Sequence, residues 1–310
     1  MRPIRFGYQV THAATADDLR SQARKAEAAG FDVVQVPDHV GIGDAVASSP
    51  FAVMMAMADA TSRVRVGTLV LNNDLHHPVN VAREAAAINQ LSEGRVELGL
   101  GAGHAFTEYH AMGLPFDPPA VRKARLAEST EIVRRLLDGE QVTFAGTHYQ
   151  LEDVRVVSVR QERLTILVGV NGKPALAHAA QHADIIGLTM LGRTLEDGQR
   201  HSVRWKPEHL DGVVRHIRHS AGNRWPSLEL NVLVQAVVIT DDRAGAAETL
   251  ARRIDGLSAE DALVTPFLAI GTHAQIADHF RQCRRRWGIS YFSVRDIDAL
   301  APVVDLLTGE

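Results

Sequence analysis

The sequence predicts an α/β fold, a closed (β/α)8 or TIM barrel with an insertion loop after a middle strand. Short apolar, β-branched segments alternate with helical patterns along all 310 residues. Such alternation indicates parallel strands joined by right-handed crossovers, and it yields eight strands. The alternative is an open doubly wound sheet, whose dinucleotide-binding form needs G-x-G-x-x-G after the first strand. Gln9-Val10-Thr11-His12 stands at that place, so we expect the barrel.

Each element has its own signal in the sequence. The expected strands span residues 4–10, 32–36, 64–71, 95–100, 164–168, 184–188, 228–239 and 289–294. The expected helices span residues 17–29, 50–62, 78–91, 119–137, 174–182, 208–221, 244–254, 273–287 and 297–307. Thr15 is a candidate N-cap and Gly30 a candidate stop for the first helix. Pro78 opens the third helix, where a missing N–H costs nothing. The Leu and Val residues of 228–239 suit a strand that is buried on both faces.

Two segments interrupt the alternation. Residues 141–151 place Ala145-Gly146 between two apolar runs, which predicts a hairpin. Residues 192–207 are polar, aperiodic and contain glycine, so we expect an insertion loop long enough to act as a lid. Neither segment has the composition of a domain boundary. We therefore expect one domain over residues 1–310.

Composition excludes several classes of function. The chain is 45% hydrophobic and 23% charged, and its net charge of −4 favours neither nucleic acid nor an anionic membrane as a partner. It lacks a signal sequence and any apolar stretch of about 20 residues, so we expect a cytoplasmic protein. Cys283 is the one cysteine, which excludes an internal disulfide and a cysteine metal cluster.

Small and polar residues gather where the expected strands end, and barrel enzymes have their active sites at those ends. The residues there are Gln9 and His12, Pro37-Asp38-His39, Asn72-Asn73-Asp74, Gly101-Ala102-Gly103-His104 with Glu108 beyond, Gly169-Val170-Asn171-Gly172-Lys173, and Thr189. No metal site is expected, because His12 is not part of an H-x-H and ligand-like spacing is absent at the other ends. A serine nucleophile is not expected either, since G-x-S-x-G does not occur.

Two kinds of strand end indicate different chemistry. Asp38-His39 is either a turn-capping pair or a group that exchanges protons near neutral pH. The glycines at 101 and 103 permit either a tight turn or a close approach to a flat or anionic ligand. The segment from Gly169 to Lys173 precedes a helix, where backbone N–H groups and a lysine suit a phosphate. Together, two glycine-rich strand ends indicate a ligand with a planar part and a phosphate.

The chain resembles the bacterial luciferase-like superfamily, and within it the deazaflavin-dependent oxidoreductases that use coenzyme F420. The matching motifs occur in order over nearly the whole chain. They are Val36-Pro37-Asp38-His39, residues 66–71 (VGTLVL), His77-Pro78 with Ala82-Arg83-Glu84, Leu91-Ser92-Glu93-Gly94-Arg95, residues 98–103 (LGLGAG), residues 144–149 (FAGTHY), residues 166–172 and Gly288-Ile289-Ser290-Tyr291. The combination of LSxGR and GLGxG is specific for the superfamily and less specific for the flavin.

This resemblance implies a cofactor site. A cis peptide at or next to Leu69-Val70 would back the flavin ring, and Asn72 could hydrogen-bond the ring or the substrate. Gly101, Ala102, Gly103 and His104 would border the ring. The phosphate would lie near Gly169, Val170, Asn171, Gly172 and Lys173, and Thr189 is a further cofactor-binding candidate. Asp38 and His39 match the aspartate–histidine pair of deazaflavin-dependent sugar-phosphate dehydrogenases.

The resemblance predicts hydride transfer between F420 and a small organic substrate. His39 is the first candidate for general acid or base, with Asp38 orienting it or touching the cofactor. His104 stands where the sugar-phosphate dehydrogenases have an acidic glutamate, so that role passes to His104 or Glu108, or the substrate differs. A monooxygenase using reduced FMN and a non-catalytic flavin-binding barrel are the alternatives. Members of the family are commonly dimers, so we expect a homodimer.

Overall fold

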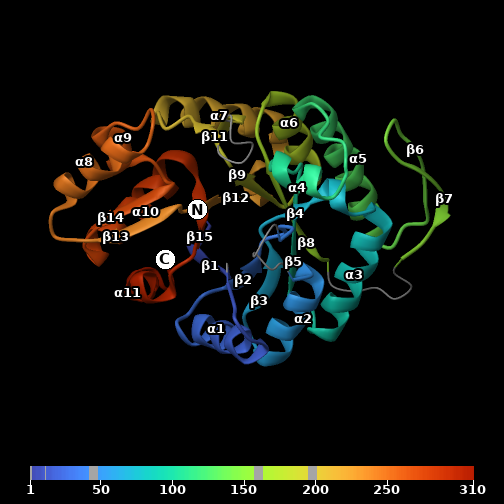
Figure 1. The fold of residues 1–310 in the computed structure, drawn as a ribbon, viewed down its shortest axis with the longest axis horizontal. Helices are drawn as coiled ribbons and strands as arrows, with labels where there is room; N and C mark the ends of the chain where they lie inside the picture. The colour runs from blue at the N-terminus through green and yellow to red at the C-terminus, as the bar shows by residue number, and fades with distance from the viewer. Residues whose placement is uncertain (1, 11, 42–47, 157–162, 195–200) are drawn as a thin grey trace.

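The computed structural model describes residues 2–10, 12–41, 48–156, 163–194 and 201–310. Eight parallel strands form a closed barrel with helices between them, which confirms the expected fold (Figure 1). The barrel strands are β1 (Arg5–Gln9), β2 (Val33–Val36), β3 (Arg65–Thr68), β5 (Val96–Gly101), β8 (Thr165–Val170), β9 (Ile185–Leu188), β12 (Glu229–Leu233) and β15 (Ile289–Val294). Each strand pairs with its neighbours in this order, and β15 pairs with β1 to close the ring.

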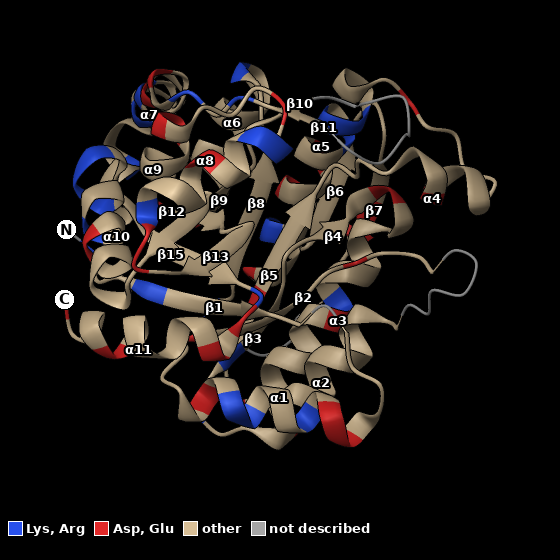
Figure 2. Ribbon diagram, turned by 60° about the vertical axis from the view of Figure 1, so that its left-hand side comes forward, with Lys and Arg blue, Asp and Glu red and all other residues tan. Residues whose placement is uncertain are grey.

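Helices surround the barrel. They include α1 (Ala16–Ala28), α2 (Pro50–Ala60), α3 (Pro78–Leu91), α5 (Pro119–Leu137), α6 (Lys173–His182), α7 (Pro207–Ala221), α10 (His273–Trp287) and α11 (Ile297–Leu307). Thr15 caps α1 as expected, since its side chain accepts a hydrogen bond from the Asp18 amide. In Figure 2 the charged residues lie mostly on these helices and on the loops, while the strands are mostly uncharged. None of the helices in the described ranges combines the length and apolar character that a membrane crossing requires.

The third barrel strand is interrupted. The expected strand at 64–71 divides into β3 and the two-residue strand β4 (Leu71–Asn72), which leads into a short 3-10 helix, η1 (Asn73–Leu75). The Leu69–Val70 peptide between them is cis, as the family resemblance implied. Both β3 and β4 pair with β5, so the chain stays beside the same neighbouring strand on both sides of the interruption.

Strands β3 and β5 approach each other very closely. A Cβ atom on Gly67 would lie 2.2 Å from the carbonyl oxygen of Glu97, and one on Gly99 would lie 2.1 Å from that of Thr68. Such contacts would force the two backbones apart, so glycine is required at both positions by the barrel itself.

The expected seventh strand at 228–239 is wrong in its second half. Strand β12 ends at Leu233, and β13 (Ala236–Ile239) leaves the barrel to pair in parallel with β14 (Leu268–Gly271). Helices α8 (Arg243–Arg253) and α9 (Ala259–Val264) join these two strands beside the barrel (Figure 1, orange). The break falls at Val234-Gln235, where a polar residue interrupts the apolar segment, and only β12 is buried on both faces, whereas β13 is partly exposed.

Of the two segments that interrupt the alternation, one has the expected structure and one does not. The hairpin is confirmed as β6 (Val142–Ala145) and β7 (Gln150–Val154). The segment expected to be a loop at 192–207 instead carries two antiparallel strands, β10 (Leu191–Thr194) and β11 (His201–Val203), and its residues 195–200 lie outside the described ranges. Helix α9 and strand β14 were not predicted, and neither were α4 (Phe106–Ala111) and the 3-10 helix η2 (Gly222–Ser227).

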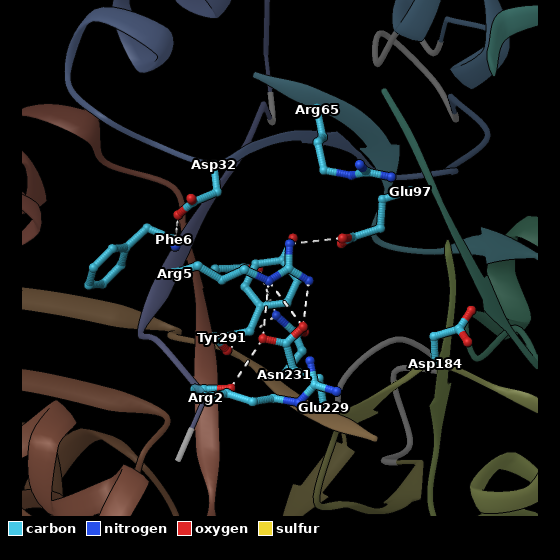
Figure 3. A network of polar contacts seen from close by, with 12 residues as sticks. Arg2, Arg5, Phe6, Asp32, Arg65, Glu97, Asp184, Glu229, Asn231 and Tyr291 are labelled. Carbon is cyan, nitrogen blue, oxygen red and sulfur yellow. Dashed lines mark hydrogen bonds and ion pairs between the residues drawn. The ribbon is translucent and has the colours of Figure 1, made fainter. Parts of the chain in front are cut away.

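A charged cluster fills the N-terminal end of the barrel (Figure 3). Nη1 of Arg5 lies 2.9 Å from Oε2 of Glu97, and Nη2 of Arg5 lies 2.7 Å from Oε2 of Glu229. The guanidinium carbon of Arg5 is 3.8 Å from the ring centroid of Tyr291. Because this end of the barrel is filled by protein side chains, a ligand has to enter from the opposite end.

Candidate active site

A cavity of about 540 Å³ opens at the C-terminal end of the barrel. All eight barrel strands contribute residues to its lining, either from their last positions or from the loops that follow. Sites for small ligands commonly have this size and position. The strand-end argument from the sequence therefore leads to the end of the barrel at which this cavity opens.

The structure brings most of the predicted site residues together around this cavity. Those that line it are Asp38, His39, Leu69, Val70, Asn72, Gly101, Ala102, Gly103, His104, Gly169, Val170, Asn171 and Thr189. Gly172 lines an adjoining cavity of about 250 Å³. Lys173 lines neither cavity; it is exposed, and its carbonyl oxygen is 2.8 Å from Nε2 of His216.

Val70 and two glycines shape one wall of the main cavity. A Cβ atom on Gly101 would lie 2.4 Å from Cγ2 of Val70, and one on Gly169 would lie 3.4 Å from Cγ1 of Val70. The valine side chain thus occupies the space that a side chain at Gly101 would need, whereas a Cβ at Gly169 would make an ordinary van der Waals contact with it. Leu69 completes an aliphatic surface there.

Asp38 is buried and anchors the chain around β4. Its Oδ2 accepts a hydrogen bond of 2.9 Å from the Asn72 amide and lies 2.7 Å from Nε2 of His76. These partners differ from the expected one, because the ring that Asp38 contacts is His76 and not His39. Asp38 therefore holds the end of β4 beside the cavity.

His39 pairs instead with Glu108. Nδ1 of His39 lies 2.7 Å from Oε1 of Glu108, whose side chain is only 10% exposed, while that of His39 is 53% exposed. The pKa of His39 is raised, mainly by the hydrogen bond to Glu108 and against an opposing effect of burial. With Nδ1 held in this way, Nε2 is the ring nitrogen that can exchange a proton with a ligand. The ring of His104 is 5.8 Å away and meets His39 edge to face.

A second network orients Asn72. The hydroxyl of Tyr109 lies 3.0 Å from both Oδ1 of Asn72 and Oδ2 of Asp74. Oδ1 of Asn72 also accepts a hydrogen bond from the Asp74 amide. Since its oxygen is occupied, Asn72 can offer its amide N–H groups to a ligand in the cavity.

Three basic residues of the lining were missed from the sequence. Arg122 and Lys123 lie in the first two turns of α5, and Arg295 follows β15 directly. Burial and the nearby Arg122 lower the pKa of Lys123, which contacts the side-chain oxygen of Asn171. Arg295 obeys the same strand-end rule as the predicted residues, so applying the rule to the last strand would have found it. Within the described ranges, no group of three or more His, Cys, Asp or Glu side chains could hold a metal ion.

Comparison with known proteins places this geometry in a family. The chain is 33% identical over 189 residues to an F420-dependent glucose-6-phosphate dehydrogenase of Nakamurella multipartita, which covers 59% of this chain and 55% of the relative. It is 35% identical over 128 residues to a 4-hydroxyprotoasukamycin monooxygenase of Streptomyces nodosus subsp. asukaensis, covering 41% of this chain and 34% of the relative. The chain thus spans about half the length, or less, of these curated relatives.

The fold has close structural counterparts. An F420-dependent secondary alcohol dehydrogenase, solved with an F420-acetone adduct, aligns with a TM-score of 0.76 over 99% of this chain and 98% of that one, at 18% identity. At this identity the likeness concerns the fold alone. The profile of the luciferase-like monooxygenase family matches residues 1–256, which is most of the chain. The protein therefore belongs to the luciferase-like monooxygenase family.

Proposed function

We propose that this protein is an F420-dependent oxidoreductase that transfers a hydride between the deazaflavin and a small organic substrate. The observation that carries the proposal is the His39–Glu108 pair, which faces the same cavity as the aliphatic surface of Leu69 and Val70. A ring system held against that surface would lie beside a group able to exchange a proton. Sequence similarity to the Nakamurella dehydrogenase supports F420 as the flavin.

The residues present fit such a cofactor. The aliphatic wall suits a planar ring, and Asn72 has amide N–H groups to offer it. The adjoining cavity is lined by Lys123, Arg204 and His209, which suit a phosphate. We assign cofactor contact to Asp38, Leu69, Val70, Asn72, Gly101, Ala102, Gly103, His104, Gly169, Val170, Asn171, Gly172 and Thr189. Lys123 replaces the exposed Lys173 as the cationic partner of the phosphate.

Proton transfer in this proposal belongs to His39. The bound deazaflavin supplies two-electron hydride exchange at one carbon. His39 gives a proton from Nε2 to a substrate oxygen during reduction and removes it during oxidation. Glu108 holds Nδ1 and stabilises the protonated ring, which is consistent with the raised pKa of His39. His104, beside this pair, is the second candidate for contact with the substrate.

A monooxygenase that uses reduced FMN is the second candidate. It is favoured by the similarity to the Streptomyces monooxygenase. The two functions need the same cavity but different flavins. Binding of the flavin is therefore the property that separates them.

The test is a titration of the purified protein with F420 and, separately, with FMN, followed by tryptophan fluorescence. We expect saturable binding of F420 with much weaker binding of FMN. Tight binding of FMN without binding of F420 would support the monooxygenase instead. A screen of alcohols, imines, enones and sugar phosphates then follows the oxidation state of F420. The His39→Asn variant should bind F420 like the wild type and lose about 10²- to 10⁴-fold in turnover.

Domain organisation, oligomeric state, location and partners also belong to this proposal. We propose that the described ranges form one domain, because the Ile4 amide donates to the Glu310 carbonyl and brings the two ends of the chain together. The homodimer remains a prediction that light scattering can test. Location in the cytoplasm and the lack of nucleic-acid and membrane partners also stay predictions.

A further inference from the structure

We propose that Arg295 binds an anionic group of the substrate, a carboxylate or a phosphate, so that the substrates of this enzyme are small organic anions. The inference rests on the proposed function, because it assigns the substrate side of the same cavity. It concerns the side of the cavity opposite the end of β5. None of the motifs that identify the family includes Arg295.

Arg295 faces the proposed cofactor wall across the cavity. It follows β15, which lies opposite β5 in the ring of eight strands. Gly101, Ala102 and Gly103, at the end of β5, line the other side. A ring bound against that wall therefore leaves the sector around Arg295 for the substrate.

Neutral side chains hold the guanidinium in place. Nε of Arg295 donates to Oε1 of Gln9 at 2.9 Å, and Nη1 donates to Oε1 of Gln235 at 3.1 Å. Gln9 is itself fixed, since its Nε2 donates to the Leu69 carbonyl at 2.7 Å. These amide oxygens orient Arg295 without neutralising its charge. An arginine placed in this way is pre-organised for an anion from solution.

No carboxylate balances the charge of Arg295 in the described part of the chain. No ion pair joins Arg295 to an acidic side chain there, and partial burial is the cause that lowers its pKa. Arg125, in contrast, lies between two aspartates that raise its pKa. Arg295 is itself exposed and lines the cavity, so the N–H groups that the two glutamines leave unused are accessible to an anion from solution.

The surroundings indicate the size of the substrate. A guanidinium has five N–H donors, and the two hydrogen bonds to glutamine leave the others for a bidentate contact with a carboxylate or phosphate. Leu233 and Phe267 offer apolar contacts in the same sector. The positive charge of Arg295 also lowers the pKa of His39, so the two groups lie within electrostatic range. The anionic group is thus close to the reacting centre, as in a small hydroxy acid, oxo acid or phosphate ester.

The test uses acetate and inorganic phosphate as probes, added to the F420-loaded protein and to the free protein. Calorimetry measures their affinity for the wild type, Arg295→Gln and Arg295→Lys. The control is Arg253→Gln, which changes an exposed arginine at the end of α8. NMR titration of His39 is the second measurement, because an anion that screens Arg295 should raise the pKa of His39.

We expect at least one probe to bind the wild type and to lose about 10- to 100-fold in affinity in Arg295→Gln. Arg295→Lys should retain part of the affinity, and Arg253→Gln all of it. The probe that binds with the higher affinity identifies the anionic group of the substrate as a carboxylate or a phosphate. The pKa of His39 should rise with the bound probe in the wild type and stay constant in Arg295→Gln.

Other outcomes separate this inference from the proposed function. If neither probe binds, or if Arg295→Gln binds both like the wild type, the anion site is refuted. A loss of F420 affinity in Arg295→Gln, with probe binding intact, would assign Arg295 to the cofactor and also refute the inference. If the wild type does not bind F420 but binds a probe through Arg295, the proposed function fails while the anion site stands.

Discussion

Replacement of Arg5 by methionine should destabilise the barrel strongly, because Arg5 is the common partner of two buried carboxylates (Figure 3). The side chains of Glu97 and Glu229 are only 2% and 7% exposed. Removing one partner of a buried ion pair leaves an uncompensated charge, which costs about 3–5 kcal/mol. Urea denaturation, followed by circular dichroism, measures the change in the free energy of unfolding.

The chain offers a matched control for this prediction. Nζ of Lys25 lies 2.6 Å from Oδ2 of Asp298, but these side chains are 51% and 77% exposed. The nitrogen–oxygen distances in the Arg5 pairs and in the Lys25 pair are similar, so a difference in their effect on stability would come from burial. Lys25→Ala should cost less than about 1 kcal/mol.

A second variant tests the physical reason. Arg5→Met combined with Glu97→Gln and Glu229→Gln removes the uncompensated charges and should recover a large part of the lost stability. If Arg5→Met costs less than about 1 kcal/mol, the pair contributes no more than a surface pair and the reasoning is refuted. The same conclusion follows if the triple variant is no more stable than the single one.

Three further predictions concern the site and the core. Glu108→Gln should lower the pKa of His39, which an NMR titration measures, because Glu108 raises that pKa in the wild type. The loss of folding stability in the variant should be largest at low pH, where His39 is protonated. This loss should vanish as the pH rises through the wild-type pKa of His39. A larger loss at high pH would contradict this. Gly101→Ala should cost about 1–3 kcal/mol in urea denaturation, since its Cβ would lie 2.4 Å from Val70, and Val70→Ala in the same chain should restore part of it. Additive losses would show that the contact is not the cause. Cys283 is buried and its thiol pKa is raised, so it should react with a disulfide reagent only after unfolding; rapid reaction of the native protein would be inconsistent with this burial.

The order of barrel strands and their common end were predictable because they follow from local patterns. Parallel strands alternating with helices must end on the same face, so residues after β2, β5 and β8 had to meet there. The excursion of β13 and β14 was not predicted, since Gln235 alone interrupts the β-branched residues at the break and a single polar residue does not end a strand pattern. The cis peptide at Leu69–Val70 came from the family resemblance and not from the pattern of residues.

The partners within the site were hidden for a different reason. Glu108 lies on the six-residue helix α4, which is too short to show a helical period in the sequence. Its contact with His39 joins residues that are 69 positions apart. Asp38 likewise contacts His76 instead of its neighbour in the chain. Such pairs depend on how loops fold over the barrel mouth, which no local signal determines.

The close approach of β3 and β5 limits how this barrel can be redesigned. Because backbone oxygens of the facing strand occupy the space beside Gly67 and Gly99, neither position can accept a side chain for a new ligand. Gly99, the first glycine of the GLGAG segment, is therefore required by the short distance between β3 and β5 and not by a ligand. A search with that motif would retrieve barrels of this shape that bind different ligands. An engineer who wishes to change the substrate should start from His104 and Arg295, which line the cavity with side chains.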